Sequence, residues 1–232
     1  MKPTLRTKGK QLLSKLLPDS NKLRYLSYLP KLESFRKNHS EKLPIFKDRP
    51  TMYQHINNEI LENRPIVYCE FGVYKGGTIE KWANLNADKD SSFYGFDTFT
   101  GLPETWVNFT GSMEKNAFDV GGDIPKSDDA RISYIKGLFQ ETLPGFLKDY
   151  DNNQQLVIHN DSDLYSSTLY VLTYADKIIV PGTIIIFDEY SSMLNEFRAL
   201  EDYSSSYMRD YEVIAATVSS EGYYSQVAIK IL

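Results

Sequence analysis

The end of the chain restricts the fold more than any other part of the sequence. Two β-rich runs, residues 211–217 and 224–232, are separated only by residues 218–223, a connection too short for a crossover helix. The two runs must therefore pair antiparallel. From Pro65 onward, in contrast, short apolar runs alternate with amphipathic stretches, which is typical of βα units around a mostly parallel sheet. The sequence predicts an α/β domain whose parallel sheet ends in an antiparallel hairpin.

Seven strands are expected in this sheet, with helices on both of its faces. Before the hairpin, strands are predicted at residues 66–71, 92–96, 132–136, 155–159 and 183–187. The helices between them are predicted at about residues 77–85, 143–148, 166–175 and 193–202. A chain of 232 residues with 41% hydrophobic content is long enough for one such domain and an appendage.

The first 50 residues form a basic arm on an acidic body. They hold 13 Lys and Arg against 4 Asp and Glu, a net charge of +9, whereas the remaining 182 residues hold 13 against 27, a net charge of −14. Leucines at helical spacing predict a short amphipathic helix that ends at Pro18. They are Leu12, Leu13, Leu16 and Leu17. A second helical stretch is predicted around residues 25–36, and a helix at about residues 51–63 opens the main domain. We therefore divide the chain into a helical arm, residues 1–50, and a domain, residues 51–232.

Charge and cysteine content limit the setting and the partners. The basic arm is compatible with nucleic-acid or anionic-lipid contact, but such helices more often pack on their own domain or on a second subunit. We expect no nucleic-acid partner, a homo-oligomer, and peripheral membrane contact as the alternative use of the arm. The single Cys69 excludes a disulfide framework, and neither a signal peptide nor a membrane-spanning stretch is recognisable. The expected location is the cytoplasm.

A glycine-rich turn follows the first predicted strand, in Glu70-Phe-Gly-Val-Tyr-Lys-Gly-Gly77. Its glycines permit a tight strand-to-helix turn and let a ligand approach the backbone at a helix N-terminus. The spacing is that of neither a dinucleotide fingerprint nor a phosphate loop. Glu70 would repel a phosphate but can accept hydrogen bonds from the ammonium group of an amino-acid ligand. The turn therefore favours a nucleotide without a pyrophosphate.

Asp97 narrows the expected ligand further. It ends the second predicted strand, where an acidic side chain can accept hydrogen bonds from both hydroxyls of a ribose. Together, the turn and Asp97 describe an adenosine that carries an amino acid. The alternatives are that Gly76 and Gly77 serve only packing and that Asp97 only caps the loop after it. Because these residues share the carboxyl ends of strands, where open α/β sheets bind ligands, we favour a ligand site.

Four carboxylates follow the fourth and fifth predicted strands: Asp161, Asp163, Asp188 and Glu189. These strand ends open on the same edge of a parallel sheet, so the acids converge, which is costly unless a cation binds or a proton is shared. Hard oxygen ligands favour Mg²⁺ or a similar divalent ion, and a metal with a nearby base would activate an alcohol as a nucleophile. The alternative is that the acids only cap a helix and solvate a loop. His159 is as easily a core residue as a catalytic one.

At these residues the chain resembles the macrocin O-methyltransferase family, S-adenosylmethionine-dependent enzymes that methylate sugar hydroxyls of natural products. The resemblance covers roughly residues 50–232 and rests on five motifs. These are Glu70-Phe-Gly-Val-Tyr-Lys-Gly-Gly-Thr78, Gly95-Phe-Asp-Thr-Phe-Thr-Gly-Leu-Pro-Glu104, Lys136-Gly-Leu-Phe-Gln-Glu-Thr-Leu-Pro144, His159-Asn-Asp-Ser-Asp-Leu-Tyr-Ser-Ser-Thr168 and Pro181-Gly-Thr-Ile-Ile-Ile-Phe-Asp-Glu-Tyr190. It implies the Rossmann-like fold of class I methyltransferases, in which a mostly parallel sheet carries an antiparallel C-terminal hairpin.

The resemblance also implies roles for individual residues. A Mg²⁺ ion would be held by Asp161, Asp188 and Glu189, with Asp163 as the general base. The family usually has Asp-Asp-Tyr where this chain has Asp188-Glu189-Tyr190, and Glu189 reaches one methylene further than Asp. The expected S-adenosylmethionine site consists of Glu70, Phe71, Gly72, Gly76, Gly77, Thr78, Asp97, Gly137, Phe139 and Asp161.

The sequence thus predicts a Mg²⁺-assisted O-methyltransferase that acts on a sugar hydroxyl of a glycosylated natural product or a surface glycan. Two alternatives are a metal-independent N-methyltransferase of a small-molecule amine and a non-catalytic protein that binds the cofactor or assembles with a partner. Residues 102–131 are long for a connection and rich in Gly and Asp. We expect them to form a lid that carries the specificity for the acceptor.

Overall fold

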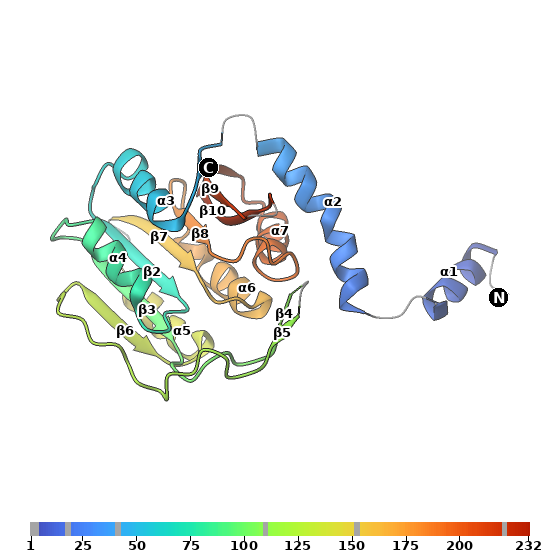
Figure 1. Cartoon of the computed structure of the whole chain (residues 1–232), viewed down its shortest axis with the longest axis horizontal. Helices are drawn as coiled ribbons and strands as arrows, with labels where there is room; N and C mark the ends of the chain where they lie inside the picture. Colours follow the sequence, from blue (N-terminus) through green and yellow to red (C-terminus); the bar gives the residue numbers. More distant parts are fainter. Residues whose placement is uncertain (1–4, 17–19, 40–42, 109–110, 151–153, 220–221) are drawn as a thin grey trace.

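An eight-stranded sheet forms the middle layer of the protein (Figure 1). The computed structural model describes residues 5–16, 20–39, 43–108, 111–150, 154–219 and 222–232. The strands of the sheet are β1 (Ile45–Phe46), β2 (Ile66–Phe71), β3 (Ser92–Asp97), β6 (Ile132–Lys136), β7 (Gln155–Asn160), β8 (Ile184–Phe187), β9 (Tyr211–Val218) and β10 (Tyr224–Ile231). Their order across the sheet is β1-β9-β10-β8-β7-β2-β3-β6. A separate small sheet pairs β4 (Trp106–Val107) with β5 (Ser112–Met113).

The strand directions confirm the predicted architecture. β6, β3, β2, β7 and β8 run parallel to one another, and β10 is antiparallel to both β8 and β9. The seven predicted strands are all present, each within one residue of its predicted bounds. The short strand β1 was not predicted, and it pairs parallel with β9 at the edge of the sheet, with Ile45 opposite Ala216. Two residues are too few to show a hydrophobic period.

Helices cover both faces of the sheet and make a three-layer sandwich. One face packs against α2 (Asn21–His39), α5 (Phe139–Asp149), α6 (Tyr165–Tyr174) and α7 (Glu196–Tyr207). The other face packs against α3 (Arg49–His55), the π-helical turn η1 (Ile56–Ile60) and α4 (Gly77–Leu85). The strands alternate between the two cores: Cys69 and Phe71 of β2 join the first, whereas Ile66 and Tyr68 join the second. A short 3₁₀ helix, η2 (Asp176–Ile178), follows α6.

Helices α5 and α7 are among those that begin elsewhere than the sequence predicts. Helix α5 begins at Phe139 rather than 143. The sequence does not signal this start, because the N-cap residue is Leu138, which has no capping side chain. Helix α7 spans Glu196–Tyr207 rather than 193–202, because the chain before it forms tight turns in which the N–H groups of Ser192 and Asn195 each donate back three residues. The start signals that a sequence offers are weak in both cases.

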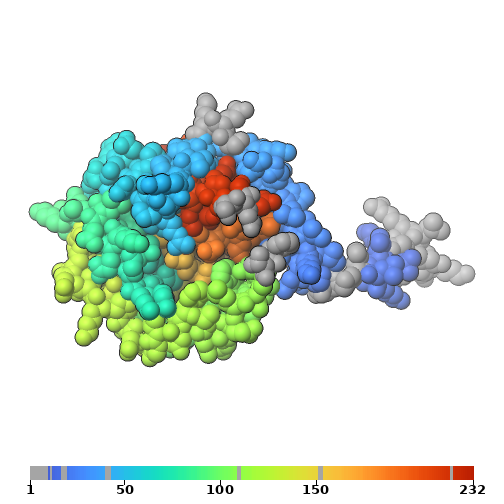
Figure 2. Space-filling view, in the orientation of Figure 1, coloured from blue at the N-terminus to red at the C-terminus, as the bar shows by residue number. Residues whose placement is uncertain are grey.

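The two helices of the arm differ in how they are placed. Helix α1 (Leu5–Leu16) lies apart from the rest of the chain (Figures 1 and 2). Its predicted end at Leu17 and Pro18 lies outside the described residues. Its leucines Leu12, Leu13 and Leu16 are exposed. No helix in the described part of the chain is both long and apolar enough to cross a membrane.

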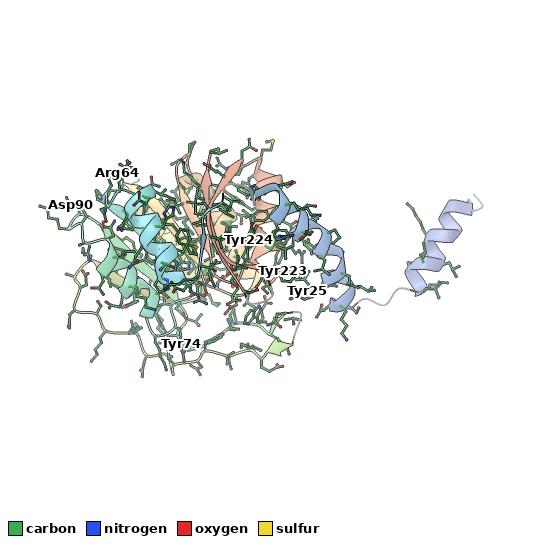
Figure 3. The ribbon with its side chains drawn as sticks, turned by 45° about the horizontal axis from the view of Figure 1, so that its top comes forward. Tyr25, Arg64, Tyr74, Asp90, Tyr223 and Tyr224 are labelled. Carbon is green, nitrogen blue, oxygen red and sulfur yellow. The ribbon has the colours of Figure 1, made fainter. Side chains whose placement is uncertain are left out.

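Helix α2, in contrast, packs on the domain. Tyr25, Leu32 and Phe35 are buried in the core that α7 and β10 share. The Phe35 ring packs against the rings of Phe197 and Tyr224, and Figure 3 labels Tyr25 on α2 and Tyr224 on β10. The boundary at residue 50 stays a prediction, although α2 contributes to the same core as the residues after it.

Candidate active site

A cavity of about 550 Å³ opens at the carboxyl ends of β2, β3, β7 and β8, the edge at which open α/β sheets bind ligands. Most of the predicted site residues line it. These are Gly72, Gly77, Thr78, Asp97, Phe139, Asp161, Asp163, Asp188 and Glu189. Four predicted residues are not part of the lining: Glu70, Phe71, Gly76 and Gly137. The topology of the sheet therefore brings together residues that are far apart in the sequence.

The glycine turn is packed tightly against the loop after β7. Gly72 has a φ of +97°, and a Cβ atom at this position would overlap the carbonyl group of Asp161. The Asp161 N–H donates to the Phe71 carbonyl at 2.9 Å, and the Gly72 N–H donates to the Phe96 carbonyl at 2.9 Å. Helix α4 begins directly after Gly76, which has a φ of +80°. The positive end of a helix dipole thus lies beside the cavity.

Asp97 holds the turn in shape. Its Oδ2 accepts hydrogen bonds from the N–H groups of Val73 (2.7 Å) and Tyr74 (2.8 Å), and its Oδ1 accepts one from the N–H of Phe99 (2.7 Å). The loop-capping alternative is therefore what the structure shows directly. A carboxylate has about four acceptor positions, so one on Oδ1 is left for a ligand hydroxyl. Binding of a ribose by Asp97 stays a prediction.

Glu70 lies beneath the turn and not in the cavity. It is fully buried, and its Oε2 accepts a hydrogen bond from the Tyr68 hydroxyl at 2.7 Å. The same hydroxyl lies 2.7 Å from Nδ1 of His159, the residue opposite Glu70 in the β2–β7 register. Burial raises the pKa of Glu70 from 4.5 to about 8 despite this hydrogen bond. In this arrangement Glu70 is part of a buried polar network, and its contact with a ligand ammonium group stays a prediction.

Two of the three predicted metal ligands lie together in a cluster, and the third lies outside it. Asp161 and Asp188 lie with His159 in a cluster whose ligand atoms are all within 4.8 Å of one another. Glu189 is not part of that cluster, and its side chain is about one-third exposed. Burial, followed by the charges of Asp188 and Glu70, raises the pKa of Asp161 well above its usual value. An acid in this setting holds its proton unless a cation compensates the charge.

Asp163 stands at the cavity wall with an unusual backbone. It has a φ of +61°, a conformation that costs energy for any residue other than glycine and that Asp and Asn tolerate best. The residue is 8% exposed. Burial is the main cause that raises its pKa to about 7, and the charges of Glu189 and Asp188 add to it. A carboxylate with such a pKa is suited to accept a proton near neutral pH.

This site lies within a stretch that matches a known family model. Residues 47–216 match the model of the macrocin O-methyltransferases. The chain belongs to this family. It is an S-adenosylmethionine-dependent O-methyltransferase. A search of curated proteins finds no match for the chain.

Solved structures agree with the fold of this methyltransferase. The O-methyltransferase NovP is similar with a TM-score of 0.58 and 20% identity, over 78% of this chain and 77% of that one. CalS11, a calicheamicin methyltransferase, is similar with a TM-score of 0.55 and 20% identity, over 99% and 94%. An O-methyltransferase from Bacillus cereus in complex with SAH is similar with a TM-score of 0.52 and 15% identity, over 96% of each chain. All three share the Rossmann-like methyltransferase fold.

The donor atoms of this methyltransferase fit a divalent cation. Asp161 and Asp188 supply hard oxygen ligands, and Nε2 of the fully buried His159 has no hydrogen-bond partner among the described residues. That nitrogen lies 3.6 Å from Oδ1 of Asp188. The sequence left His159 between a core and a catalytic role. Its unpaired nitrogen beside two carboxylates makes it a candidate ligand next to the predicted set of Asp161, Asp188 and Glu189.

The sequence prediction missed a charged residue that contacts the carboxylates of the methyltransferase site. Arg49, at the start of α3, lines the cavity and places a guanidinium nitrogen 2.9 Å from Oδ2 of Asp188 and 3.9 Å from Oε1 of Glu189. The available signal was Asp48-Arg49-Pro50, because an N-cap residue followed by proline marks a helix start. Because the predicted helix begins at about residue 51, Arg49 fell in the arm and was not connected with the carboxylates.

The predicted lid segment lines the cavity in part. Leu102, Trp106, Met113 and Phe118 all contribute to the wall. The strand β4 is tied to the body because the Val107 carbonyl accepts hydrogen bonds from the Tyr25 hydroxyl (3.3 Å) and the Asn195 amide (3.0 Å). Residues 109–110 lie outside the described part of the segment. Opening and closing of this segment stays a prediction.

Proposed function

We propose that this methyltransferase transfers a methyl group from S-adenosylmethionine to a sugar hydroxyl of a glycosylated natural product or a surface glycan, with the help of Mg²⁺. The observation that carries the proposal is Asp163, a largely buried acid at the cavity wall with a pKa of about 7, next to other acids that favour a cation. An amine acceptor would need no metal for its nucleophile. The retained carboxylates also argue against a non-catalytic binding protein.

The residues of the chain divide the work of the reaction. The turn at Gly72 and Gly77 and the N-terminus of α4 would hold the methyl donor, with Asp97 beside its ribose. Asp163 would receive the proton of the acceptor hydroxyl while the hydroxyl oxygen attacks the methyl carbon of S-adenosylmethionine. The carbon–sulfur bond breaks at the same time, which leaves S-adenosylhomocysteine with a neutral sulfur. Orientation and the placement of charge account for most of the expected rate enhancement.

Asp161 and Asp188 would hold the metal, with Glu189 or His159 as a third protein ligand. A bound Mg²⁺ would supply a positive charge that stabilises the oxyanion developing on the acceptor. The acceptor class rests on the family and on the similar structure of CalS11, a TDP-rhamnose 3'-O-methyltransferase. The apolar side chains of the lid segment, Leu102 and Trp106 among them, would select the acceptor beside this charged edge.

Binding and chelation experiments test the proposed function. Isothermal titration should show binding of S-adenosylmethionine and S-adenosylhomocysteine; absence of both would remove the proposal. With labelled cofactor and a panel of sugar-containing acceptors, methyl transfer should require a divalent metal and fall to background in EDTA, because an alcohol needs its charge compensated. Full activity on these acceptors in EDTA would remove the metal from the proposal, and transfer only to amine-bearing acceptors, unaffected by EDTA, would favour the amine methyltransferase.

The basic arm carries a separate proposal about location. We propose an arm of residues 1–50, a methyltransferase domain of residues 51–232, and a cytoplasmic homo-oligomer.

Leu12, Leu13 and Leu16 are 61%, 57% and 67% exposed on α1, and apolar side chains among lysines suit the surface of an anionic membrane. The full chain should float with anionic but not with neutral liposomes, and a variant with these leucines replaced by Glu should remain in solution. Light scattering of both proteins then reports whether α1 instead joins subunits.

A further inference from the structure

Arg49 places a positive charge against the acidic site from outside the methyltransferase motifs. Its guanidinium contacts Asp188 at 2.9 Å and approaches Glu189 at 3.9 Å. The Asp188 side chain is 1% exposed, whereas that of Arg49 is 43% exposed. The guanidinium therefore reaches from the open side of the cavity to a buried carboxylate. Asp188 and Glu189 are two of the three residues predicted to hold the metal.

The backbone that carries Arg49 is fixed. Asp48 caps α3, because its Oδ1 accepts hydrogen bonds from the Thr51 N–H (2.9 Å) and the Thr51 hydroxyl (2.7 Å). Pro50 restricts the first turn of the helix further. The Cα atom of Arg49 thus has little freedom, but its long side chain has room to turn into the cavity that it lines. The guanidinium is therefore held near Asp188, but it can change its position.

We propose that Arg49 is a tethered counter-ion that occupies the place of the divalent cation between Asp188 and Glu189, and that it must swing away for the metal to bind. The inference rests on the proposed metal-assisted function and adds a built-in competitor to it. Arg49 compensates part of the negative charge of this edge when no metal is bound, and it weakens the affinity for the metal.

The charges around Asp188 support a competition rather than a permanent pair. Asp161 offers a ligand oxygen within 4.8 Å of that of Asp188, Asp163 and Glu189 line the same cavity, and the fully buried Glu196 accepts a hydrogen bond from the Glu189 N–H at 2.8 Å. One guanidinium charge does not balance this many acids. A divalent ion supplies twice the charge of Arg49 to the same oxygens, and the attraction between charges at such short range is strong. The metal can therefore displace the guanidinium, but at a reduced affinity.

A metal titration tests the competition directly. Free Mn²⁺ is measured by electron paramagnetic resonance at constant ionic strength for the wild type, Arg49→Gln and Arg49→Lys. We expect Arg49→Gln to bind Mn²⁺ about tenfold more tightly than the wild type or better, since a competing charge is gone. Arg49→Lys should be intermediate, because its ammonium keeps the charge but not the planar guanidinium fork. Arg64→Gln removes the same charge at the opposite end of β2, where Arg64 is labelled in Figure 3, and should match the wild type.

Thermal unfolding with and without Mg²⁺ is a second measurement, because a purely structural ion pair would not change how much Mg²⁺ raises the Tm. Without metal, Arg49→Gln should unfold at a lower temperature than the wild type, and added Mg²⁺ should raise its Tm more than that of the wild type.

Equal or weaker Mn²⁺ binding by Arg49→Gln overturns the competition. If Arg49→Gln no longer binds S-adenosylhomocysteine, Arg49→Lys carries the test, and Mn²⁺ binding no tighter than the wild type overturns it. If no variant binds Mn²⁺ while all bind S-adenosylhomocysteine, the inference and the metal assistance fail together and the methyl-donor site stands.

Discussion

Gly72→Ala is expected to lower the free energy of unfolding by more than about 4 kcal/mol, at the upper end of what single substitutions do. Two effects add up at this position. Alanine is strained at a φ of +97°, and its Cβ would overlap the Asp161 carbonyl on the neighbouring strand end. The obstacle is backbone, which cannot move without breaking the hydrogen bonds between β2 and β7. Because typical domains are stable by only about 5–15 kcal/mol, much of the variant should be unfolded or insoluble.

Gly77→Ala in the same turn is the matched control. A Cβ at Gly77 would meet no heavy atom within 4 Å, and Gly77 is the first residue of α4, where alanine is favourable. Urea unfolding followed by circular dichroism measures both variants. Gly77→Ala should stay within about 1 kcal/mol of the wild type. If Gly72→Ala also did so, the turn would not pack against Asp161 as the structure has it.

The sequence predicted this fold well because its signals are local. The strand at Ile66–Phe71 and the helix at Gly77–Leu85 have the predicted bounds, since an apolar run, a glycine turn and an amphipathic stretch follow one another without a gap. The C-terminal hairpin was equally certain, because the short connection allowed one pairing only. Where the local signal is weak, as at Leu138 before α5, the prediction was off by several residues.

The site was predicted less completely, because side-chain direction and distant partners decide it. Glu70 stands beside the glycine turn in the sequence, but it shares a strand face with Tyr68 and therefore points into the core on the α4 side. Strand alternation could have shown this. Arg49 could not be assigned in the same way, because it comes before the first long strand and meets Asp188 only through the packing of α3 on the sheet.

Asp163→Asn is the second substitution with a large expected effect, and it acts on the reaction rather than on the fold. Turnover should fall by about 10²- to 10⁴-fold, the usual contribution of a general base. Asparagine tolerates the left-handed backbone at a φ of +61° at least as well as aspartate, so the loop should keep its shape. Affinities for S-adenosylhomocysteine and Mn²⁺ should stay near those of the wild type. Asp90→Asn, at an exposed residue labelled in Figure 3, makes the same chemical change away from the cavity and should keep full turnover.

The pH dependence separates a base from a merely structural acid. A base must be unprotonated, and burial raises the pKa of Asp163 to about 7. In the wild type, kcat/KM should therefore rise with pH and level off near pH 7 or below it, since a bound cation stabilises the charged carboxylate and lowers its pKa. Asp163→Asn should lose this rising limb together with its turnover. If the variant keeps both the limb and the rate, the proton goes to another group and Asp163 only shapes the loop.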